Sequence, residues 1–301
     1  MFDELFERGG LSLERLRNFL AVVDSGSIAA AADRDLNRQS LMSRQIRELE
    51  EFFGTELTTR RGKSIAVTPE GRRLGELIRV NLKGFSDFLL DARAQPKTIT
   101  FGAGGSSLEW LVGPAAQSIR SALGEVTVRL EVNRTSELVE KVRDGRLDFA
   151  VLRSDGLPRG SLSMPITEVG FVLCVPEAMD RPKLSVTELL RKVPLALPVP
   201  GGNFRDLLHD HFDAHDIPWK AQVESSSFLQ AFSLIRGGAF AAVLPTTGAA
   251  RLPEGQFRTR NIPELREQSR KLVLHWNERQ METRGIAPAA ITKVRDAVRG
   301  G

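Results

Sequence analysis

Five polar side chains share one face of a helix that the sequence predicts at residues 37–53. They are Gln39, Ser40, Ser43, Arg44 and Arg47, at spacings of one, three and four. Arginine can pair bidentately with guanine and glutamine with adenine, while serine bonds to bases or phosphates. This face therefore has the chemistry to read a DNA major groove, although an ordinary amphipathic surface helix would show the same spacing.

The opposite face of this helix is apolar. Met42, Ile46, Leu49 and Phe53 recur at spacings of four, three and four, so we expect all four to be buried. Asn37 stands where an N-cap residue is expected, and the positive end of the helix dipole would then point toward the same partner.

Two shorter helices are predicted before it. Ser12 can cap the first helix. The apolar stripe of that helix consists of Leu13, Leu16, Phe19, Leu20 and Val23. Ser27 can cap an alanine-rich second helix at residues 28–33. A short helix, a tight turn and a longer helix with an exposed polar face form a helix-turn-helix arrangement.

After Gly54, residues 57–68 (LTTRRGKSIAVT) predict a small hairpin. Three cations, Arg60, Arg61 and Lys63, surround Gly62 at its tip. We interpret the hairpin as a wing whose cations contact phosphates or a minor groove. A solvated basic turn is the alternative where no helix-turn-helix precedes it.

A long helix is predicted to begin at Thr68 and Pro69 and to run to about Arg93. Its apolar seam consists of Leu74, Ile78, Leu82, Phe85 and Leu89. A long helix with one apolar seam usually buries that seam in a partner helix, so we interpret it as a dimerisation linker.

Residues 11–68 resemble the winged helix-turn-helix domain of the LysR-type transcriptional regulators. The resemblance is carried by Leu16, Phe19, the GSIAAAA run at residues 26–32, Gln39, SRQI at residues 43–46, Leu49, Glu50, Leu57, Arg60 and TPEG at residues 68–71. The chain departs from the family at Asp35, Asn37, Arg38 and Thr58-Thr59, where Leu, Val, Ser and an aromatic are usual. These departures affect the contacted DNA sequence more than the fold, and we include Arg38 among the predicted DNA-binding residues.

From residue 97 onward, strand-like and helix-like segments alternate, which predicts an α/β architecture. The resemblance implies a two-lobed effector domain of periplasmic-binding-protein fold. The predicted fold class is thus multidomain α plus α/β, with a winged helix-turn-helix domain (11–68), a linker (dimerisation) helix (69–95) and an effector-binding domain (97–301). Lobe 1 is expected at about residues 97–168 and 271–301, and lobe 2 at about residues 169–270.

Four predicted helix starts in this half offer free backbone N–H groups, which suit an anion such as a carboxylate. The predicted effector-binding residues there are Gly104, Gly105, Ser106, Ser107, Thr135, Gly201, Gly202, Asn203, Ser226 and Ser227. Helix capping explains any one of these starts. Four in one domain favour a shared site for a small anionic effector between the lobes.

Other candidate chemistry is weaker. His211 and His215 are one helical turn apart and could chelate a metal, but with their neighbouring aspartates they are typical of a solvated helix face. Cys174 lies in an apolar stretch that is typical of packing. No Ser/His/Asp or Cys/His motif is present. We therefore predict no metal, no cofactor and no enzymatic activity.

Composition sets further limits. The single cysteine excludes an internal disulfide framework and fits a reducing cytoplasm. No apolar stretch approaches the ~20 residues needed to span a bilayer, so no membrane partner is expected. The formal charge is +4, but residues 1–96 contain 15 Lys or Arg and 15 Asp or Glu. DNA binding must therefore depend on the placement of particular arginines.

We expect a cytoplasmic, homo-oligomeric regulator that binds double-stranded promoter DNA and responds to a small anionic effector. A dimer and a tetramer fit the linker helix equally well, and the resemblance implies a tetramer. Two other classes stay open at this point: a solute-binding protein with an incidental helical segment, and an α/β enzyme without a DNA role. Deletion of residues 1–96 and a turnover screen would distinguish these alternatives.

Overall fold

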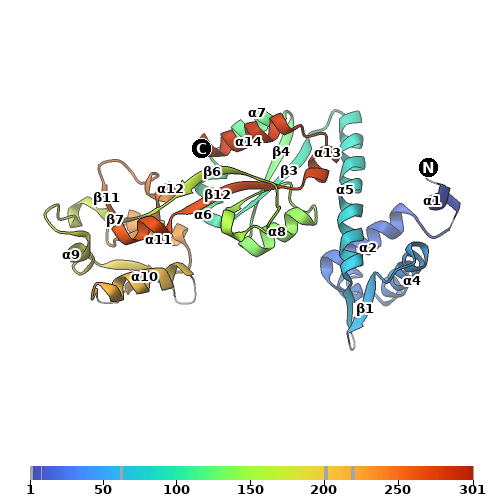
Figure 1. Cartoon of the computed structure of the whole chain (residues 1–301), viewed down its shortest axis with the longest axis horizontal. Helices are drawn as coiled ribbons and strands as arrows, with labels where there is room; N and C mark the ends of the chain where they lie inside the picture. The colour runs from blue at the N-terminus through green and yellow to red at the C-terminus, as the bar shows by residue number, and fades with distance from the viewer. Residues whose placement is uncertain (1–2, 8, 62–63, 200–202, 218–220, 301) are drawn as a thin grey trace. The chain divides into compact units, whose positions relative to one another are not determined.

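The computed structural model describes residues 3–7, 9–61, 64–199, 203–217 and 221–300 (Figure 1). The chain folds into two compact units. The N-terminal unit consists of Met1–Lys97, Glu140–Asp148 and Asn277–Ile286. The α/β unit consists of Thr98–Val139, Phe149–Trp276 and Ala287–Gly301. Two short segments from later in the chain thus belong to the same unit as the first 97 residues.

The N-terminal unit begins with α1 (Asp3–Glu7), α2 (Leu13–Ser25), α3 (Ile28–Ala31) and α4 (Leu36–Phe53). Ser12 and Ser27 cap α2 and α3 as predicted, and Gly54 ends α4 in the left-handed conformation. The buried core of these helices consists of Phe19, Val22, Ile28, Ala32, Met42, Ile46 and Leu49. The predicted helix-turn-helix fold is confirmed.

Details of two helices differ from the prediction. The N-cap of α4 is Asp35 and not Asn37, because the Asp35 carboxylate accepts the N–H of Arg38 at 2.9 Å. Phe52 is buried and Phe53 is exposed, since the N-terminal segment at Gly10 lies against the Phe52 side chain. On α2, Leu13 is exposed, and Val22 is buried in the core.

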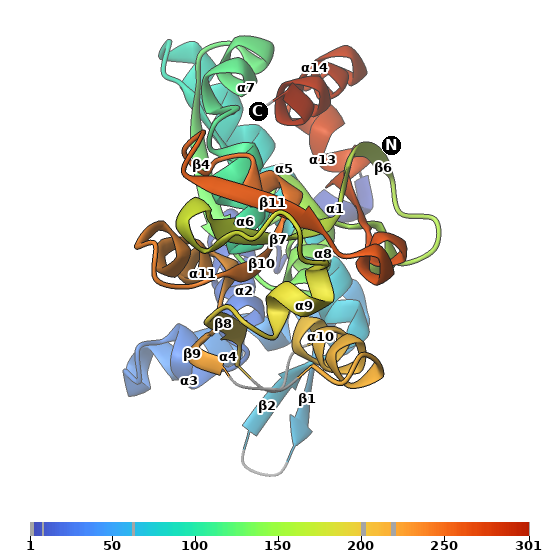
Figure 2. The ribbon, with the colours of Figure 1, turned by 90° about the vertical axis from the view of Figure 1, so that its left-hand side faces the viewer.

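The predicted hairpin consists of β1 (Thr58–Arg61) and β2 (Ser64–Val67), which pair antiparallel with Thr58 opposite Val67 (Figure 2). One carboxylate oxygen of Glu50 on α4 accepts hydrogen bonds from the backbone N–H groups of Leu57 and Thr58, both at 2.9 Å. This carboxylate therefore attaches the start of the hairpin to α4.

The long helix α5 (Pro69–Ala92) starts at the Thr68 cap as predicted. Its apolar seam is divided between two environments. Leu74, Ile78 and Leu82 pack into the helix-turn-helix core. Phe85 and Leu89 are exposed, and so is Phe88 at 73% of its surface.

Three glycines let α5 approach its neighbours closely. A Cβ added at Gly71 would lie 2.2 Å from the carbonyl oxygen of Leu57, and one at Gly75 would lie 3.1 Å from Val23 of α2. A Cβ at Gly84 would lie 2.6 Å from Thr283, the last residue of α13 (Glu278–Thr283). The helix is therefore packed against α2 near its start and against α13 near its end.

The larger sheet of the α/β unit has the strand order β4-β3-β5-β12-β6. Its strands are β3 (Lys97–Ala103), β4 (Val126–Val132), β5 (Phe149–Arg153), β6 (Ser163–Val169) and β12 (Arg270–Trp276). β3 and β5 are parallel, while β12 is antiparallel to β5 and β6. The helical segments between and after these strands are α6 (Gly105–Ser107), the π-helix η1 (Leu108–Val112), α7 (Ala116–Leu123), α8 (Thr135–Arg143), η2 (Ser154–Gly156) and α14 (Pro288–Gly300). We call this sheet with its helices lobe 1.

Lobe 2 lies between β6 and β12 in the chain. Its strands are β7 (Phe171–Pro176), β8 (Leu195–Pro198), β9 (Ala221–Ser225), β10 (Ala242–Pro245) and β11 (Phe257–Asn261). They form an antiparallel sheet of order β10-β7-β11 and a parallel β8-β9 pair. Its helical segments are η3 (Glu177–Met179), α9 (Val186–Leu190), α10 (Asn203–Ala214), α11 (Phe228–Arg236), α12 (Thr246–Ala249) and η4 (Pro263–Gln268). The predicted multidomain α plus α/β fold class is confirmed.

Candidate functional site

The polar face of α4 borders a surface recess of about 560 Å³ in the N-terminal unit. Gln39, Ser40, Ser43 and Arg47 line it together with residues at the start of α3 and Ile65 of β2. The hydrophobic core holds the opposite face of α4 against α2, so these polar side chains point away from the core. Four of the predicted DNA-binding residues therefore meet at one surface.

Three arginines of α4 differ in their partners. Arg38 is paired with Asp33 at 2.8 Å, and both side chains are exposed. Arg44 is 69% exposed and lies 3.9 Å from Glu48. Arg47 is exposed and donates to Ser43 at 3.4 Å. Exposed pairs of this kind are weak, so a phosphate or base edge can replace these partners.

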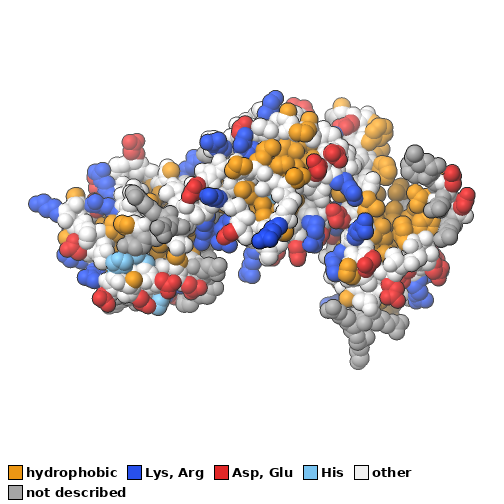
Figure 3. All heavy atoms as spheres, in the orientation of Figure 1, with side chains coloured by type: hydrophobic (Ala, Val, Ile, Leu, Met, Phe, Trp, Pro, Cys, Tyr) orange, Lys and Arg blue, Asp and Glu red, His pale blue; other side chains and the backbone are white. Residues whose placement is uncertain are grey.

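At the predicted DNA-binding residues of the wing, the structure describes backbone positions only. Arg60 and Arg61 lie on β1 opposite Ile65 and Ser64, and their side chains lie outside the described residues. Lys63 also lies outside them. On the side of the N-terminal unit that Figure 3 shows, positive and negative side chains are interspersed, in agreement with the balanced charge of the first 96 residues.

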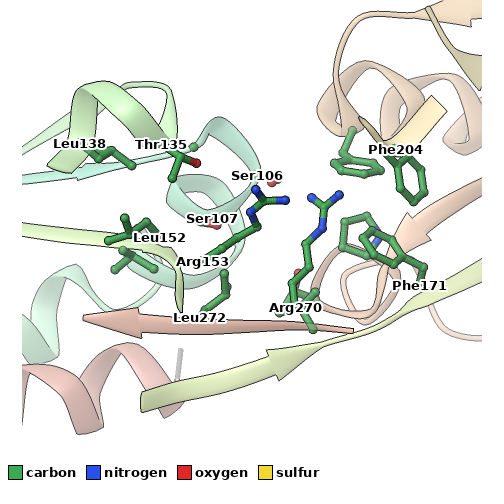
Figure 4. Close-up of a pocket in the computed structure, with 16 residues that line it drawn as sticks. Ser106, Ser107, Thr135, Leu138, Leu152, Arg153, Phe171, Phe204, Arg270 and Leu272 are labelled. Atoms are coloured by element: carbon green, nitrogen blue, oxygen red, sulfur yellow. The ribbon is translucent and has the colours of Figure 1, made fainter. Parts of the chain in front are cut away.

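A pocket of about 390 Å³ lies between the two lobes of the α/β unit (Figure 4). Four of the predicted effector-binding residues, Gly104, Ser106, Ser107 and Thr135, line it from the helix starts of lobe 1. Gly105 is absent from this lining. The pocket walls are mainly apolar and include Leu138, Leu152, Val169, Phe171, Phe204, Phe228 and Leu272.

The other predicted effector residues fall elsewhere. Ser226 and Ser227 line a second pocket of about 410 Å³. Phe204 and Phe228 border both pockets, and their rings are in edge contact with centroids 4.8 Å apart. Gly201 and Gly202 lie outside the described residues, as does the side chain of Asn203, whose backbone begins α10.

Two arginines in the first pocket were not predicted. Arg153 ends β5 and Arg270 begins β12, and Figure 4 shows their guanidinium groups pointing toward one another in the pocket. Arg153 is paired with Asp155 at 3.2 Å. Arg270 lies over the rings of Phe171 and Phe204, 5.1 and 5.9 Å from their centroids. The sequence signal that could have identified these two arginines is a cation at the first or last residue of an inner strand of an α/β sheet.

The electrostatics of the pocket favour an anion. Burial lowers the pKa of Arg270, and the neighbouring Arg153 lowers it further, whereas Asp155 raises it. Arginine still keeps its charge at neutral pH, so two mutually repelling cations face one space, with the carboxylate of Asp155 beside them. An anion placed between them would relieve this repulsion and could bond to both forks.

The remaining candidate sites carry little chemistry. His211 and His215 have ring centroids 4.6 Å apart on α10, and Figure 3 shows histidine and acidic side chains together on the surface there. Within the described ranges, no group of three His, Cys, Asp or Glu side chains could hold a metal ion. Cys174 is fully buried on β7, as expected for packing. None of the helices in the described parts of the chain is long and apolar enough to cross a membrane.

Comparison with known proteins identifies both halves of the chain. Residues 13–72 match the family model "Bacterial regulatory helix-turn-helix protein, lysR family", and residues 92–296 match "LysR substrate binding domain". The transcriptional regulator PecT of Dickeya dadantii is 27% identical over 234 residues, which cover 76% of this chain and 70% of PecT.

Solved structures show the same fold. A full-length OxyR variant from Pseudomonas aeruginosa superposes with a TM-score of 0.63 at 22% identity, covering 96% of this chain and 95% of that one. Full-length CbnR in complex with its target DNA superposes with a TM-score of 0.54 at 22% identity, covering 95% and 100%.

The second family model covers more than half of the chain, and the first covers the helix-turn-helix domain. The named relatives are transcription regulators and not enzymes. Regulators of this family bind promoter DNA and small-molecule effectors and form oligomers. The chain belongs to the LysR family of DNA-binding transcriptional regulators.

Proposed function

We propose that the chain reads promoter DNA in the cytoplasm with the polar face of α4 and contacts the backbone or minor groove with the wing. The single observation that supports this most is the recess where Gln39, Ser40, Ser43 and Arg47 meet on a face left free by the core. Arg38 and Arg44 flank this surface from exposed positions. Arg60, Arg61 and Lys63 are assigned to the wing contact from the sequence.

Fluorescence anisotropy on DNA from the region beside the protein's own gene tests this proposal. Arg47→Ala and Arg44→Ala are each expected to weaken binding by about 1–3 kcal/mol if the side chain reads a base. Arg159→Ala is the matched control, because it removes one exposed cation from a loop of the α/β unit. Equal affinities for all four proteins, or a loss that depends only on salt, would contradict the assignment of α4.

We further infer that the effector is a small organic anion whose charged group lies between Arg153 and Arg270 and whose apolar part contacts the pocket walls. The arginine pair, the hydroxyl groups of Ser106, Ser107 and Thr135 and the aliphatic and aromatic lining support this class. Benzoate and other organic acids should raise the melting temperature, while matched neutral amides such as benzamide should not.

Arg270→Gln is expected to weaken binding of such an acid by about tenfold or more, because it removes a charge-assisted hydrogen bond. Arg258→Gln, at an exposed ion pair of lobe 2, should leave binding unchanged. A ligand that binds equally well with and without its carboxylate would show that the effector is not anionic.

We assign oligomerisation to α5, whose last turns expose Phe85, Phe88 and Leu89. Phe88→Glu should lower the oligomer mass measured by light scattering, whereas a retained mass would place the interface elsewhere. The proposed domains are residues 11–68 for DNA binding, 69–95 for the linker helix and 97–301 for effector binding.

A further inference from the structure

A cluster of buried charged side chains joins α5 to the two inserted segments of the N-terminal unit. Arg284, directly after α13, donates from Nε and Nη2 to the two carboxylate oxygens of Asp87 on α5, at 2.7 and 3.0 Å. Its Nη1 lies 2.6 Å from Asp148. Asp148 also pairs with Lys83 of α5 at 3.2 Å and accepts a hydrogen bond from the amide of Gln280.

The members of this cluster are deeply buried and must therefore stay together. Asp148 is 0% exposed, Arg284 is 4% exposed and Asp87 is 6% exposed. Burial lowers the pKa of Lys83 and opposes ionisation of Arg284, but the hydrogen bonds to Asp87 and Asp148 raise the pKa of Arg284 overall. Separating any partner would leave an uncompensated charge away from water. Residues 140–148 and 277–286 are consequently constrained to move with α5.

Both inserted segments are directly joined in the chain to strands that carry the pocket arginines. Asp148 immediately precedes β5, which ends at Arg153. Asn277 immediately follows β12, which begins at Arg270. The two strands pair antiparallel, with Phe149 opposite Trp276 and Arg153 opposite Leu272. One strand pair thus leads from the charged cluster at one end to the two arginines at the other.

The middle of α5 is tied to α2 of the DNA-binding helices. Arg79 donates from Nη1 to Asp24 on α2 at 3.0 Å and from Nε to the backbone carbonyl of Asp144 at 2.7 Å. One side chain of α5 therefore holds both a helix of the helix-turn-helix domain and an inserted segment.

We propose that the cluster of Lys83, Asp87, Asp148, Gln280 and Arg284 couples occupancy of the arginine pocket to α5 and hence to the DNA-binding helices. This rests on the proposed effector role of the pocket. An anion that draws Arg153 and Arg270 together shifts the paired strands β5 and β12. The strands displace Asp148 and α13, and the cluster makes α5 follow because its charges cannot separate.

Hydrogen–deuterium exchange of the full-length chain tests the coupling from both ends. Asp87→Asn is expected to raise exchange by about tenfold in residues 140–148 and 277–286 and also in β5 and β12. Arg270→Gln is expected to change exchange in the same inserted segments and in α5. The control Asp91→Asn removes an exposed carboxylate of α5 that pairs with Lys97 at 2.9 Å, and it should leave β5 and β12 unchanged. An effect of Asp87→Asn confined to α5 and α13, or of Arg270→Gln confined to β12, would overturn the proposal.

A double-mutant experiment on DNA binding gives a second, independent result. Any change that Arg270→Gln causes in affinity for promoter DNA is expected to disappear in the Asp87→Asn background. An equal change in both backgrounds would show that the coupling does not pass through the cluster. If the wild-type protein fails to bind the DNA, the proposed function fails, while the exchange experiment still decides the coupling.

Gly84→Ala perturbs the same contact with all five polar side chains in place. The added methyl group would lie 2.6 Å from Cγ2 of Thr283 and force α13 away from α5. We expect Gly84→Ala to reproduce the exchange pattern of Asp87→Asn. Adding Thr283→Ala to the Gly84→Ala variant should restore the wild-type pattern, because it removes the opposing methyl group. An unchanged pattern in Gly84→Ala would contradict the proposal.

Discussion

The carboxylate of Glu50 accepts hydrogen bonds from both the backbone N–H and the hydroxyl group of Thr58, at 2.9 and 3.0 Å. Glu50 belongs to α4 and Thr58 is the first residue of the wing. The same carboxylate also accepts the backbone N–H of Leu57, so it accepts three hydrogen bonds in all. Glu50 therefore fixes the position of the wing relative to α4, the helix proposed to read DNA.

Glu50→Ala is expected to lower the free energy of unfolding by about 1–3 kcal/mol, because it leaves two backbone donors and a hydroxyl group without a charged acceptor. DNA affinity should fall as well, since the wing is no longer held. Urea denaturation and DNA anisotropy measure the two effects. Glu51→Ala, at the exposed neighbouring position of α4, should change neither, and equal effects of both variants would refute the anchoring role.

Cys174 should be unreactive in the folded protein. Burial raises the pKa of its thiol to about 12, and the thiolate is the reactive form. Labelling by Ellman's reagent at neutral pH is expected only at the rate of unfolding, and it should accelerate with denaturant. Rapid labelling of the native protein would show that β7 opens without global unfolding.

His275 should make the protein less stable as the pH falls below about 6.5. Burial lowers the pKa of His275 below its ordinary value of 6.5, although its contact with the carbonyl group of Leu162 raises it. The unfolded chain therefore takes up a proton as the pH falls through 6.5 before the folded chain does, and stability rises with pH across this window. Urea denaturation at about pH 8 and about pH 5.5 should show a smaller pH effect in His275→Gln than in the wild type. An equal effect in both would assign the pH dependence to other groups.

Arg34 lies in the left-handed region with φ 63°, next to Asp33 with φ 50°. Arg34→Gly is expected to be neutral or to stabilise by up to about 1 kcal/mol, because relief of strain offsets the entropy of glycine in the unfolded chain. Arg17→Gly, at an exposed position inside α2, should cost about 1 kcal/mol. Equal losses in urea denaturation would argue against strain at this turn.

The features that the sequence predicts well depend on contacts a few residues long. Ser12, Ser27 and Thr68 each accept a hydrogen bond from the backbone three residues ahead, and Gly54 ends α4 in the left-handed conformation. Side chain and partner lie on the same turn, so residue type and spacing suffice.

The features that escaped prediction depend on tertiary neighbours. Asp87 and Arg284 are 197 residues apart in the chain, and Arg153 meets Arg270 only because β5 and β12 pair. Phe52 and Phe53 fit the helical period about equally well, and contact with the segment at Gly10 decides which is buried. Spacing along one element contains no information about such partners.

Polar strands also escaped prediction. β11 reads FRTRN and lies at the edge of its sheet, with three of its five side chains exposed. β9 reads AQVES and pairs only with β8 among the described strands. Hydrogen bonds to β7 and β8 stabilise these segments more than their own hydrophobic pattern does.

Because residues 140–148 and 277–286 belong to the N-terminal unit, they limit where the chain can be cut to make fragments or chimeric proteins. A fragment that begins at residue 97 retains Asp148 and Arg284 but loses Lys83 and Asp87 with α5. In such a fragment the buried charges of Asp148 and Arg284 would lose these partners and become exposed to water. A chimeric regulator with the DNA specificity of another protein should therefore be joined before residue 69, so that α5 and the C-terminal part come from the same protein.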